Sequence, residues 1–340
     1  MGHGRNAMII LFTMLILLVI LVNGWTDAPN AIAGCVSTRA MSPSSALALA
    51  AAANFAGAIL MAVFSPKVAI TLYNIADFGN DTKGALFALC AGLFAVILWA
   101  TVAWVFGLPT SESHALISGI SGAALAKRRS FEALNSREWH LVIMGLVITT
   151  VLPFILGFLL NKTLTLILKG FPRRSVIRYF LRAERFGAAS SALIHGAQDS
   201  QKFMGIYMLG ITLYKGDGER IASIPLYVVL ICASVMTLGT MLGGARIIKK
   251  IGCDMTELDA VGGSAADTAS SAVLFICSLT GIPASTTHSK ASAMIGTGIC
   301  KRRGVDPRIV GQMFAAWGLT FPFCAALGYI LSRLLSFCFQ

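Results

Sequence analysis

The sequence predicts an all-α membrane protein that crosses the bilayer many times and consists of two similar halves. Of the 340 residues, 56% are hydrophobic and only 12% are charged, whereas a soluble domain carries about 25% charged residues. Apolar stretches follow one another along the whole chain, and elements of the first half recur in the second. This composition excludes an ordinary soluble enzyme, a disordered chain and a protein held by a single anchor.

The apolar segments give the expected helices in chain order. They lie near residues 7–36, 45–64, 84–106, 110–126, 138–160, 187–214, 221–243, 264–280, 286–300 and 307–336. Residues 246–260 mix lysine and arginine with isoleucine, which is typical of an amphipathic helix at the membrane interface. Helices satisfy their own backbone hydrogen bonds in lipid, and each crossing needs about 20 residues, so we expect roughly 10–12 membrane segments.

The first segment also resembles a signal peptide, because Arg5 precedes an apolar core and small residues follow at 31–33. However, Asp27 and Pro29 lie between the core and those small residues, and a similar pattern recurs in mid-chain. We therefore expect residues 1–34 to form a first membrane segment.

The net charge of +12 predicts how the chain is divided. Basic residues are most frequent over residues 161–186, and cytoplasmic loops carry an excess of lysine and arginine. We expect this stretch to be a cytoplasmic connector between a first repeat (1–160) and a second repeat (187–340). The sequence has no basic patch interleaved with aromatic residues, so we expect no nucleic-acid partner.

Two motifs repeat at nearly the same spacing. Asp27 matches Asp199 at a shift of 172, and each stands three positions after a glycine. The stretch Gly107–His114 matches Gly281–His288 at a shift of 174, and the match continues to basic triplets at 127–129 and 301–303. Repeats in a polytopic chain are typical of secondary transporters, whose substrate sites use broken helices. We expect two inverted repeats with broken or re-entrant helices.

Asp27 and Asp199 each lie inside an apolar segment, where an ionised carboxylate is costly unless it is paired or solvated. Gly24, Pro29 and Gly196 flank them and predict helix breaks that free backbone carbonyls. Carboxylate and carbonyl oxygens together suit Na⁺, and the carboxylates alone suit a proton. The alternative is a structural polar pair between helices.

Two clusters of hydroxyl side chains follow Pro109 and Pro283, which are expected to end helices. The clusters contain Ser111 and Ser113 in the first half, and Ser285, Thr286 and Thr287 in the second. We expect them in the first turn of the next helix, where unpaired N–H groups and the positive end of the helix dipole attract anions. The alternative is that Thr110 or Ser285 only caps its helix.

Four charged or titratable residues near these clusters have open roles. Glu112 could bind a cation, carry a proton or simply favour the helix start. His114 and His288 could support the anion or the carboxylates, or be ordinary core residues. Lys202 could neutralise the anion or extend its ammonium to the interface.

These motifs resemble the PiT family of inorganic phosphate transporters. The resemblance rests on Gly24–Asn30 with Gly107–His114, on Gly196–Lys202 with Gly281–His288, and on Ala315–Pro322 near the end. It implies an inverted-repeat helical protein of the plasma membrane, often a homodimer, that imports phosphate with Na⁺ or H⁺. Thr26 and Gln198 stand where the family usually has Asn, and Lys202 replaces an Asn.

Carried over by position, the resemblance implies a phosphate site and an ion site that share two carboxylates. The phosphate site comprises Ser111, Ser113, Ser285, Thr286 and Thr287 with Asp27 and Asp199, and the coupling-ion site comprises Asp27, Asn30 and Asp199. Beside these carried-over residues, we expect Thr26, Gln198 and Glu112 as further members of the coupling-ion site. We expect a symporter without organic cofactor, not an enzyme. The alternatives are a sulfate or other oxyanion symporter and an anion channel.

Overall fold

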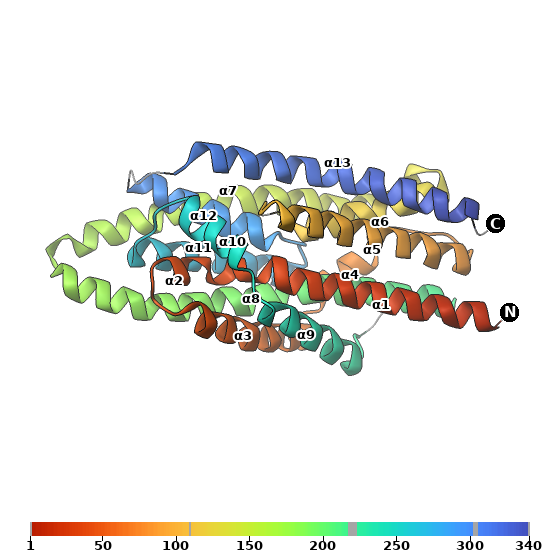
Figure 1. The fold of residues 1–340 in the computed structure, drawn as a ribbon, viewed down its shortest axis with the longest axis horizontal. Coiled ribbons are helices and arrows are strands. Elements are labelled where there is room, and N and C mark those ends of the chain that lie inside the picture. Colours follow the sequence, from red (N-terminus) through yellow and green to blue (C-terminus); the bar gives the residue numbers. More distant parts are fainter. Residues whose placement is uncertain (1, 109, 217–222, 302–304, 339–340) are drawn as a thin grey trace.

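The computed structural model describes residues 2–108, 110–216, 223–301 and 305–338. Within these residues the chain is helical apart from turns and two isolated β-bridges, which confirms the predicted all-α class. Figure 1 shows long helices lying side by side, with both termini at one end and the turn between α7 and α8 at the other. Pro109, Arg302, Arg303 and the start of segment 221–243 lie outside the described residues.

The first half contains α1 (Gly2–Thr26), a 3-10 turn η1 (Ala28–Ile32), α2 (Ala33–Ser37), α3 (Pro43–Phe64), α4 (Lys67–Tyr73), α5 (Thr82–Val105), α6 (Glu112–Arg128), η2 (Phe131–Ala133) and α7 (Ser136–Ile167). After the turn η3 (Leu168–Gly170), the second half contains α8 (Arg173–Lys215), α9 (Leu226–Met241), α10 (Ala245–Lys249), the π-helical turn η4 (Lys250–Asp254), α11 (Ala260–Thr280), α12 (Thr286–Cys300) and α13 (Pro307–Cys338).

All ten apolar segments predicted from the sequence are helical in their described parts. Among the described residues, 6 helices are long and apolar enough to cross a membrane, and α6, α8, α9 and α12 are too short or too polar to meet that criterion. Of the helix predicted over 246–260, the part up to Asp254 is helical as α10 and η4, with Ile247, Ile248 and Ile251 buried, while residues 255–259 form a turn. Residues 161–186 are helical except near the α7–α8 turn.

The helix break predicted at Asp199 is wrong, although the one at Asp27 is confirmed. Helix α1 ends at Thr26 and the chain continues as η1, whereas α8 runs unbroken through Asp199 over 43 residues. Gly196 serves close packing instead, since a Cβ there would lie 2.2 Å from the carbonyl oxygen of Asn54 in α3.

Two helical hairpins, α5–α6 and α11–α12, are closed by the same kind of contact where the first helix starts and the second helix ends. Asp81 caps α5 and Asp259 caps α11. Each cap also accepts a hydrogen bond from a lysine near the end of the second helix, Lys127 to Asp81 and Lys301 to Asp259. The hydrogen bond from Lys127 lowers the pKa of Asp81 below its ordinary value. The hairpins therefore hold the starts of α6 and α12 at a fixed distance from these ends.

The helices of the two halves pack in corresponding pairs. Helix α6 packs on α5 and α13, while α12 packs on α11 and α7. Likewise α1 packs on α9, and α8 on α3. The second helix of each hairpin therefore packs against a long helix of the other half, and the hairpin tips meet where the ring centroids of His114 and His288 lie 4.7 Å apart.

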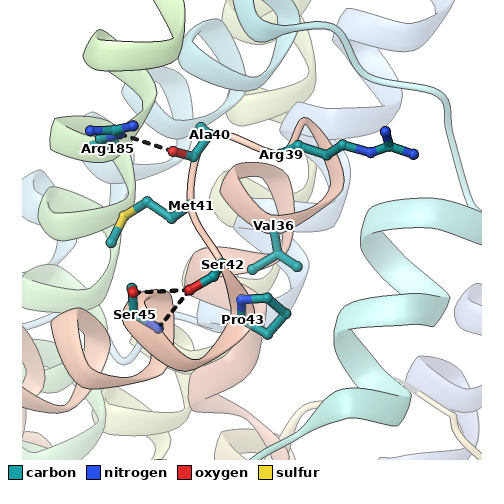
Figure 2. Close-up of a pocket in the computed structure, with 8 residues that line it drawn as sticks. All are labelled: Val36, Arg39, Ala40, Met41, Ser42, Pro43, Ser45 and Arg185. Atoms are coloured by element: carbon teal, nitrogen blue, oxygen red, sulfur yellow. Dashed lines mark hydrogen bonds between the residues drawn. The ribbon is translucent and has the colours of Figure 1, made fainter.

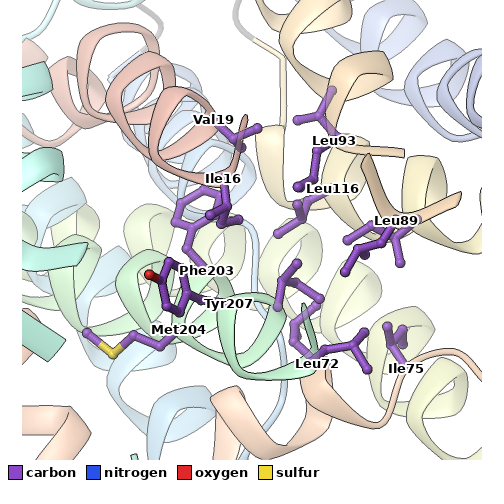
Figure 3. Packing of buried hydrophobic residues seen from close by; sticks show 14 of the residues in the cluster. Ile16, Val19, Leu72, Ile75, Leu89, Leu93, Leu116, Phe203, Met204 and Tyr207 are labelled. Atoms are coloured by element: carbon purple, nitrogen blue, oxygen red, sulfur yellow. The ribbon is translucent and has the colours of Figure 1, made fainter. Parts of the chain in front are cut away.

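A buried apolar cluster fixes α1 and α8 beside the first hairpin. Figure 3 shows side chains of this cluster, including Ile16 and Val19 of α1, Leu89 and Leu93 of α5, Leu116 of α6 and Phe203 of α8. Burying such side chains contributes about 1.5–3 kcal/mol each when measured against water. Large apolar side chains on the outer faces of α7 and α13, such as Ile143 and Leu334, are exposed, as expected for surfaces in contact with lipid.

A very close helix contact predicts a test of this packing. A Cβ added to Gly57 in α3 would lie 1.8 Å from the carbonyl oxygen of Leu193 in α8, so Gly57→Ala forces the two backbones apart. We expect a loss of stability of about 3 kcal/mol, the upper end for overpacking, seen as a lower unfolding temperature in detergent. Gly318→Ala is the matched control, because no atom lies within 4 Å of the added Cβ, and its stability should be unchanged or slightly higher. An equal effect of both substitutions would contradict the packing argument.

Candidate functional site

The end of α1 places Asp27 in the interior of the protein, where its side chain is 2% exposed. Its Oδ1 accepts a hydrogen bond from Asn30 Nδ2 at 2.6 Å and another from the hydroxyl of Thr287. Asn30 Nδ2 also lies 2.9 Å from Thr287 Oγ1. The break after α1 thus joins Asp27 directly to the start of α12.

Asp199 lies in the middle of α8 and is fully buried. Its Oδ1 accepts a hydrogen bond from Lys202 Nζ at 2.6 Å, while His195 Nε2 lies 3.2 Å from Oδ2. Asn23 Nδ2 and Thr286 Oγ1 donate weakly to Oδ2, at 3.4 and 3.5 Å. These donors come from α1, α8 and α12, so Asp199 connects three helices.

The two predicted carboxylates are close neighbours. One ligand atom each of Asp27, His195 and Asp199 lies within 4.8 Å of the others, and all three residues are buried. Carboxylates this close repel each other when both are ionised, so the arrangement favours a positive charge between or beside them. Oxygen ligands of this kind suit a hard cation.

The starts of α6 and α12 face the same space with matching geometry. Ser111 Oγ accepts from the backbone N of His114 at 3.3 Å, and Ser285 Oγ accepts from that of His288 at 3.2 Å. These two serines are therefore the helix caps, as the alternative interpretation held for Ser285. The other hydroxyls do not cap a helix. Ser113 accepts from Lys202 at 2.5 Å, and Thr286 and Thr287 donate to Asp199 and Asp27.

Comparison with known proteins identifies the family of the chain. The profile of the phosphate transporter family matches residues 23–178 and 168–328. The chain belongs to the phosphate transporter family. Its membership confirms the predicted resemblance, and it confirms the expectation of a multi-pass membrane protein that is not an enzyme.

Individual relatives extend over almost the entire chain. A probable low-affinity inorganic phosphate transporter of Bacillus subtilis (strain 168) is 34% identical over 339 residues, covering 97% of this chain and 99% of its own. A protein of the same description from Rhizobium meliloti (strain 1021) is 37% identical, with 90% of each chain covered. Among solved structures, a sodium-dependent phosphate transporter has the same fold, with a TM-score of 0.86, 19% identity, and 97% of this chain and 99% of that chain covered.

Two further predicted residues, Thr26 and Glu112, also lie at the site. The Thr26 hydroxyl donates to Glu112 Oε1, and both side chains are buried. Glu112 is the first residue of α6, where a negative charge is favoured by the helix dipole. A third carboxylate therefore lies at the edge of the pair formed by Asp27 and Asp199.

The structure does not bring Gln198 together with the carboxylates. Its amide donates to the carbonyls of Leu274 and Ile282 at 3.3 and 3.4 Å, and its oxygen accepts from Ala284 N at 3.5 Å. Gln198 instead holds the turn between α11 and α12 against α8. This position makes it a support for the start of α12.

His114 and His288 contact each other and aromatic rings rather than the acids. Their ring centroids are 4.7 Å apart, His288 stacks on Trp317 at 3.8 Å, and His114 lies 4.6 Å from Phe321. Their ring nitrogens have no hydrogen-bond partner within the described part of the chain. The structure thus supports the interpretation of these two residues as core residues behind the helix starts.

Two residues that contact Asp199 were missed as site residues. Asn23 and His195 occupy equivalent places in the two halves, four positions before Asp27 and Asp199 respectively. Residues four apart lie on the same face of a helix, so this repeated spacing was a usable signal. His195 Nδ1 also lies 3.2 Å from Asn54 Oδ1 of α3, which fixes the orientation of the ring.

A second buried ionic cluster lies beside the site. Lys290 of α12 donates to Asp267 of α11, and Thr38 donates to Glu184 of α8 at 2.6 Å. Asp267 and Glu184 both approach Gly34, whose added Cβ would lie 3.9 and 3.5 Å from their oxygens. Neither acid was predicted as a site residue, because neither belongs to a repeated motif.

A surface pocket of about 610 Å³ lies at the turn between α2 and α3, and neither Asp27 nor Asp199 lines it. Figure 2 shows Arg39 and Arg185 at its wall, with Arg185 Nε donating to the carbonyl of Ala40 at 2.9 Å. Its lining residues are Val36, Arg39, Ala40, Met41, Ser42, Pro43, Ser45 and Arg185. It therefore does not correspond to the site predicted from the sequence.

The capping geometry predicts a stability effect that needs no ligand. Ser285→Ala removes the acceptor for the backbone N of His288 and should lower stability by about 1 kcal/mol. Ser285→Asn supplies a new acceptor and should restore most of the unfolding temperature, measured in detergent without phosphate. If the alanine variant were as stable as the parent, Ser285 would not be the cap of α12.

Proposed function

We propose that this chain is a secondary transporter that moves inorganic phosphate inward together with Na⁺. The observation that supports this most strongly is the meeting of Asp27 and Asp199 with the hydroxyl-bearing starts of α6 and α12 in one buried space. The names of the relatives from Bacillus subtilis and Rhizobium meliloti support phosphate as the anion. The name of the structural neighbour supports Na⁺ over H⁺ as the coupling ion.

In this proposal the cation binds at the carboxylate side of the site. Asp27 Oδ1 and Thr287 Oγ1 supply oxygens, and Asn30 can turn its amide oxygen toward the same point. Such ligands match the preference of Na⁺ for hard oxygen donors. A buried carboxylate without a nearby positive charge is costly in a membrane protein, so cation binding there is favourable.

The anion binds at the two helix starts. The first turns of α6 and α12 direct backbone N–H groups and the positive ends of their dipoles into the site. Ser113, Thr286 and Thr287 add hydroxyl donors without adding charge. Neutral donors bind an oxyanion while leaving it able to depart.

Cation and anion binding are coupled through shared hydroxyls. In the structure, Thr287 donates to Asp27 and Thr286 donates to Asp199. A cation on Asp27 competes for the same carboxylate oxygen, which frees the Thr287 hydroxyl to donate to phosphate. Phosphate affinity therefore rises when the cation is bound, and by linkage cation affinity rises with phosphate.

Alternating access in this proposal follows from two inverted repeats. In support, α1 and α8 run in opposite directions, as do α7 and α13 (Figure 1). The reciprocal packing of α6 on α13 and of α12 on α7 is also what a twofold relation between the halves predicts. Rocking of one helix set against the other would then open the site to alternate sides. The expected homodimer stays a prediction.

Uptake into proteoliposomes tests the proposal. We expect the purified chain to accumulate labelled phosphate against its gradient when an inward Na⁺ gradient is imposed, and much less under a pH gradient alone. Collapsing the Na⁺ gradient with an ionophore should abolish accumulation. Flux that only runs downhill would indicate a channel, and accumulation of sulfate without phosphate would assign a different oxyanion.

Removing one hydroxyl tests the anion site. Thr287→Val should raise KM for phosphate roughly 10- to 100-fold, because a hydrogen bond to a charged partner contributes about 1.5–3 kcal/mol. Thr287→Ser keeps the hydroxyl and should remain close to the parent. Thr237→Val in α9 is the matched control, since among the described residues its hydroxyl donates to the carbonyl of Ala233 in its own helix and to no site residue. Equal KM values for the valine variants at 237 and 287 would remove Thr287 from the site.

A further inference from the structure

The ammonium of Lys202 lies inside the site and is fully buried. It is 2.6 Å from Asp199 Oδ1, 2.5 Å from Ser113 Oγ and 2.5 Å from the carbonyl oxygen of Ala284. These partners come from α8, the first turn of α6 and the residue before the cap of α12. Lys202 does not extend to the membrane interface.

This coordination leaves Lys202 no donor for an anion. An ammonium has three N–H donors and no acceptor, and here a carboxylate, a hydroxyl and a carbonyl receive all three. The same three kinds of oxygen are the ligands of a hard cation such as Na⁺. The ammonium is therefore coordinated as a metal cation would be.

The repeated position in the first half has a different side chain. Asn30 stands three positions after Asp27, just as Lys202 stands three positions after Asp199. Asn30 gives Asp27 a neutral amide donor at 2.6 Å, whereas Lys202 gives Asp199 a full positive charge. Other titratable groups near the Lys202–Asp199 pair include Asp27, Glu112 and His195, and His195 lies on the other oxygen of Asp199.

We propose that the ammonium of Lys202 is a built-in cation that permanently fills the cation site of Asp199, so that only the Asp27 side takes up a coupling cation. This inference rests on the proposed cation-coupled transport and adds its stoichiometry. One mobile cation accompanies each phosphate, and Lys202 supplies a second positive charge that is never released.

The test replaces Lys202 by the residue that the first half has at this position. In Lys202→Asn proteoliposomes, the Na⁺ dependence of phosphate uptake should change from a Hill coefficient of about one to about two, because a second Na⁺ must now bind for transport. The half-saturating Na⁺ concentration should also rise. The inference is overturned if Lys202→Asn transports phosphate with the parent's Na⁺ dependence.

Two variants control for charge and folding. Lys169→Asn removes an exposed lysine in the turn η3 between α7 and α8, and it should keep the parent's Hill coefficient. Lys202→Asn combined with Asp199→Asn removes both charges of the pair and should show no additional Na⁺ requirement. A double variant that still requires a second Na⁺ contradicts the assignment of that ion to Asp199.

The parent protein provides a measurement that does not depend on any variant's folding. The Na⁺-to-phosphate flux ratio, from parallel ²²Na⁺ and ³²P uptake, should be close to one, and a ratio of two or more overturns the inference. In detergent without phosphate, Na⁺ should raise the unfolding temperature of Lys202→Asn with a second-order dependence on concentration. If the parent accumulates no phosphate, the proposed function is wrong. If it accumulates phosphate with a Na⁺-to-phosphate flux ratio of two, the proposed function stands and only the role of Lys202 as a built-in cation is wrong.

Discussion

The burial of Asp27 and Asp199 in one small space is the constraint on which the rest of the site depends. Two carboxylates in a poorly solvated interior are destabilising unless donors and positive charge surround them. The chain supplies an ammonium from α8, amides from α1 and the 3-10 turn after it, and hydroxyls from the start of α12. Because these donors come from separate elements, satisfying the acids requires all of those elements to meet at one point.

The two short helices meet there because hairpins position them. A helix that starts inside a protein has unpaired N–H groups, and the caps Ser111 and Ser285 satisfy one of them in each case. At the opposite ends, Lys127 and Lys301 bind the aspartates that cap the preceding helices. Each hairpin is thus fixed at its outer end and polar at its inner end, which sets the depth of the site.

The sequence predicted the parts of this site that depend on local chemistry and missed those that depend on packing. The positions of Ser111 and Ser285 followed from a helix break and a repeated motif, and the structure places both at helix starts, as predicted. Gly196 gave the same local signal as a helix break, yet it allows Asn54 to approach α8. Gln198 carried a polar side chain in a repeated motif, but its partners are backbone groups brought close by folding. Only tertiary structure distinguishes these cases.

If the two halves are the inverted repeats of the proposed mechanism, the chemical differences between them are informative. In an inverted repeat with identical halves, the two end conformations would have equal energy, so each difference between halves shifts that balance. Lys202 connects α8 to both hairpin tips by charge-assisted hydrogen bonds, which are stronger than neutral ones, whereas the Asn30 amide connects η1 to Thr287 and Asp27 by neutral donors. Under the proposed mechanism, movement at α8 breaks the stronger set. Since a ligand shifts a conformational equilibrium only by its differential affinity, phosphate and its cation must stabilise that movement more than the one at α1.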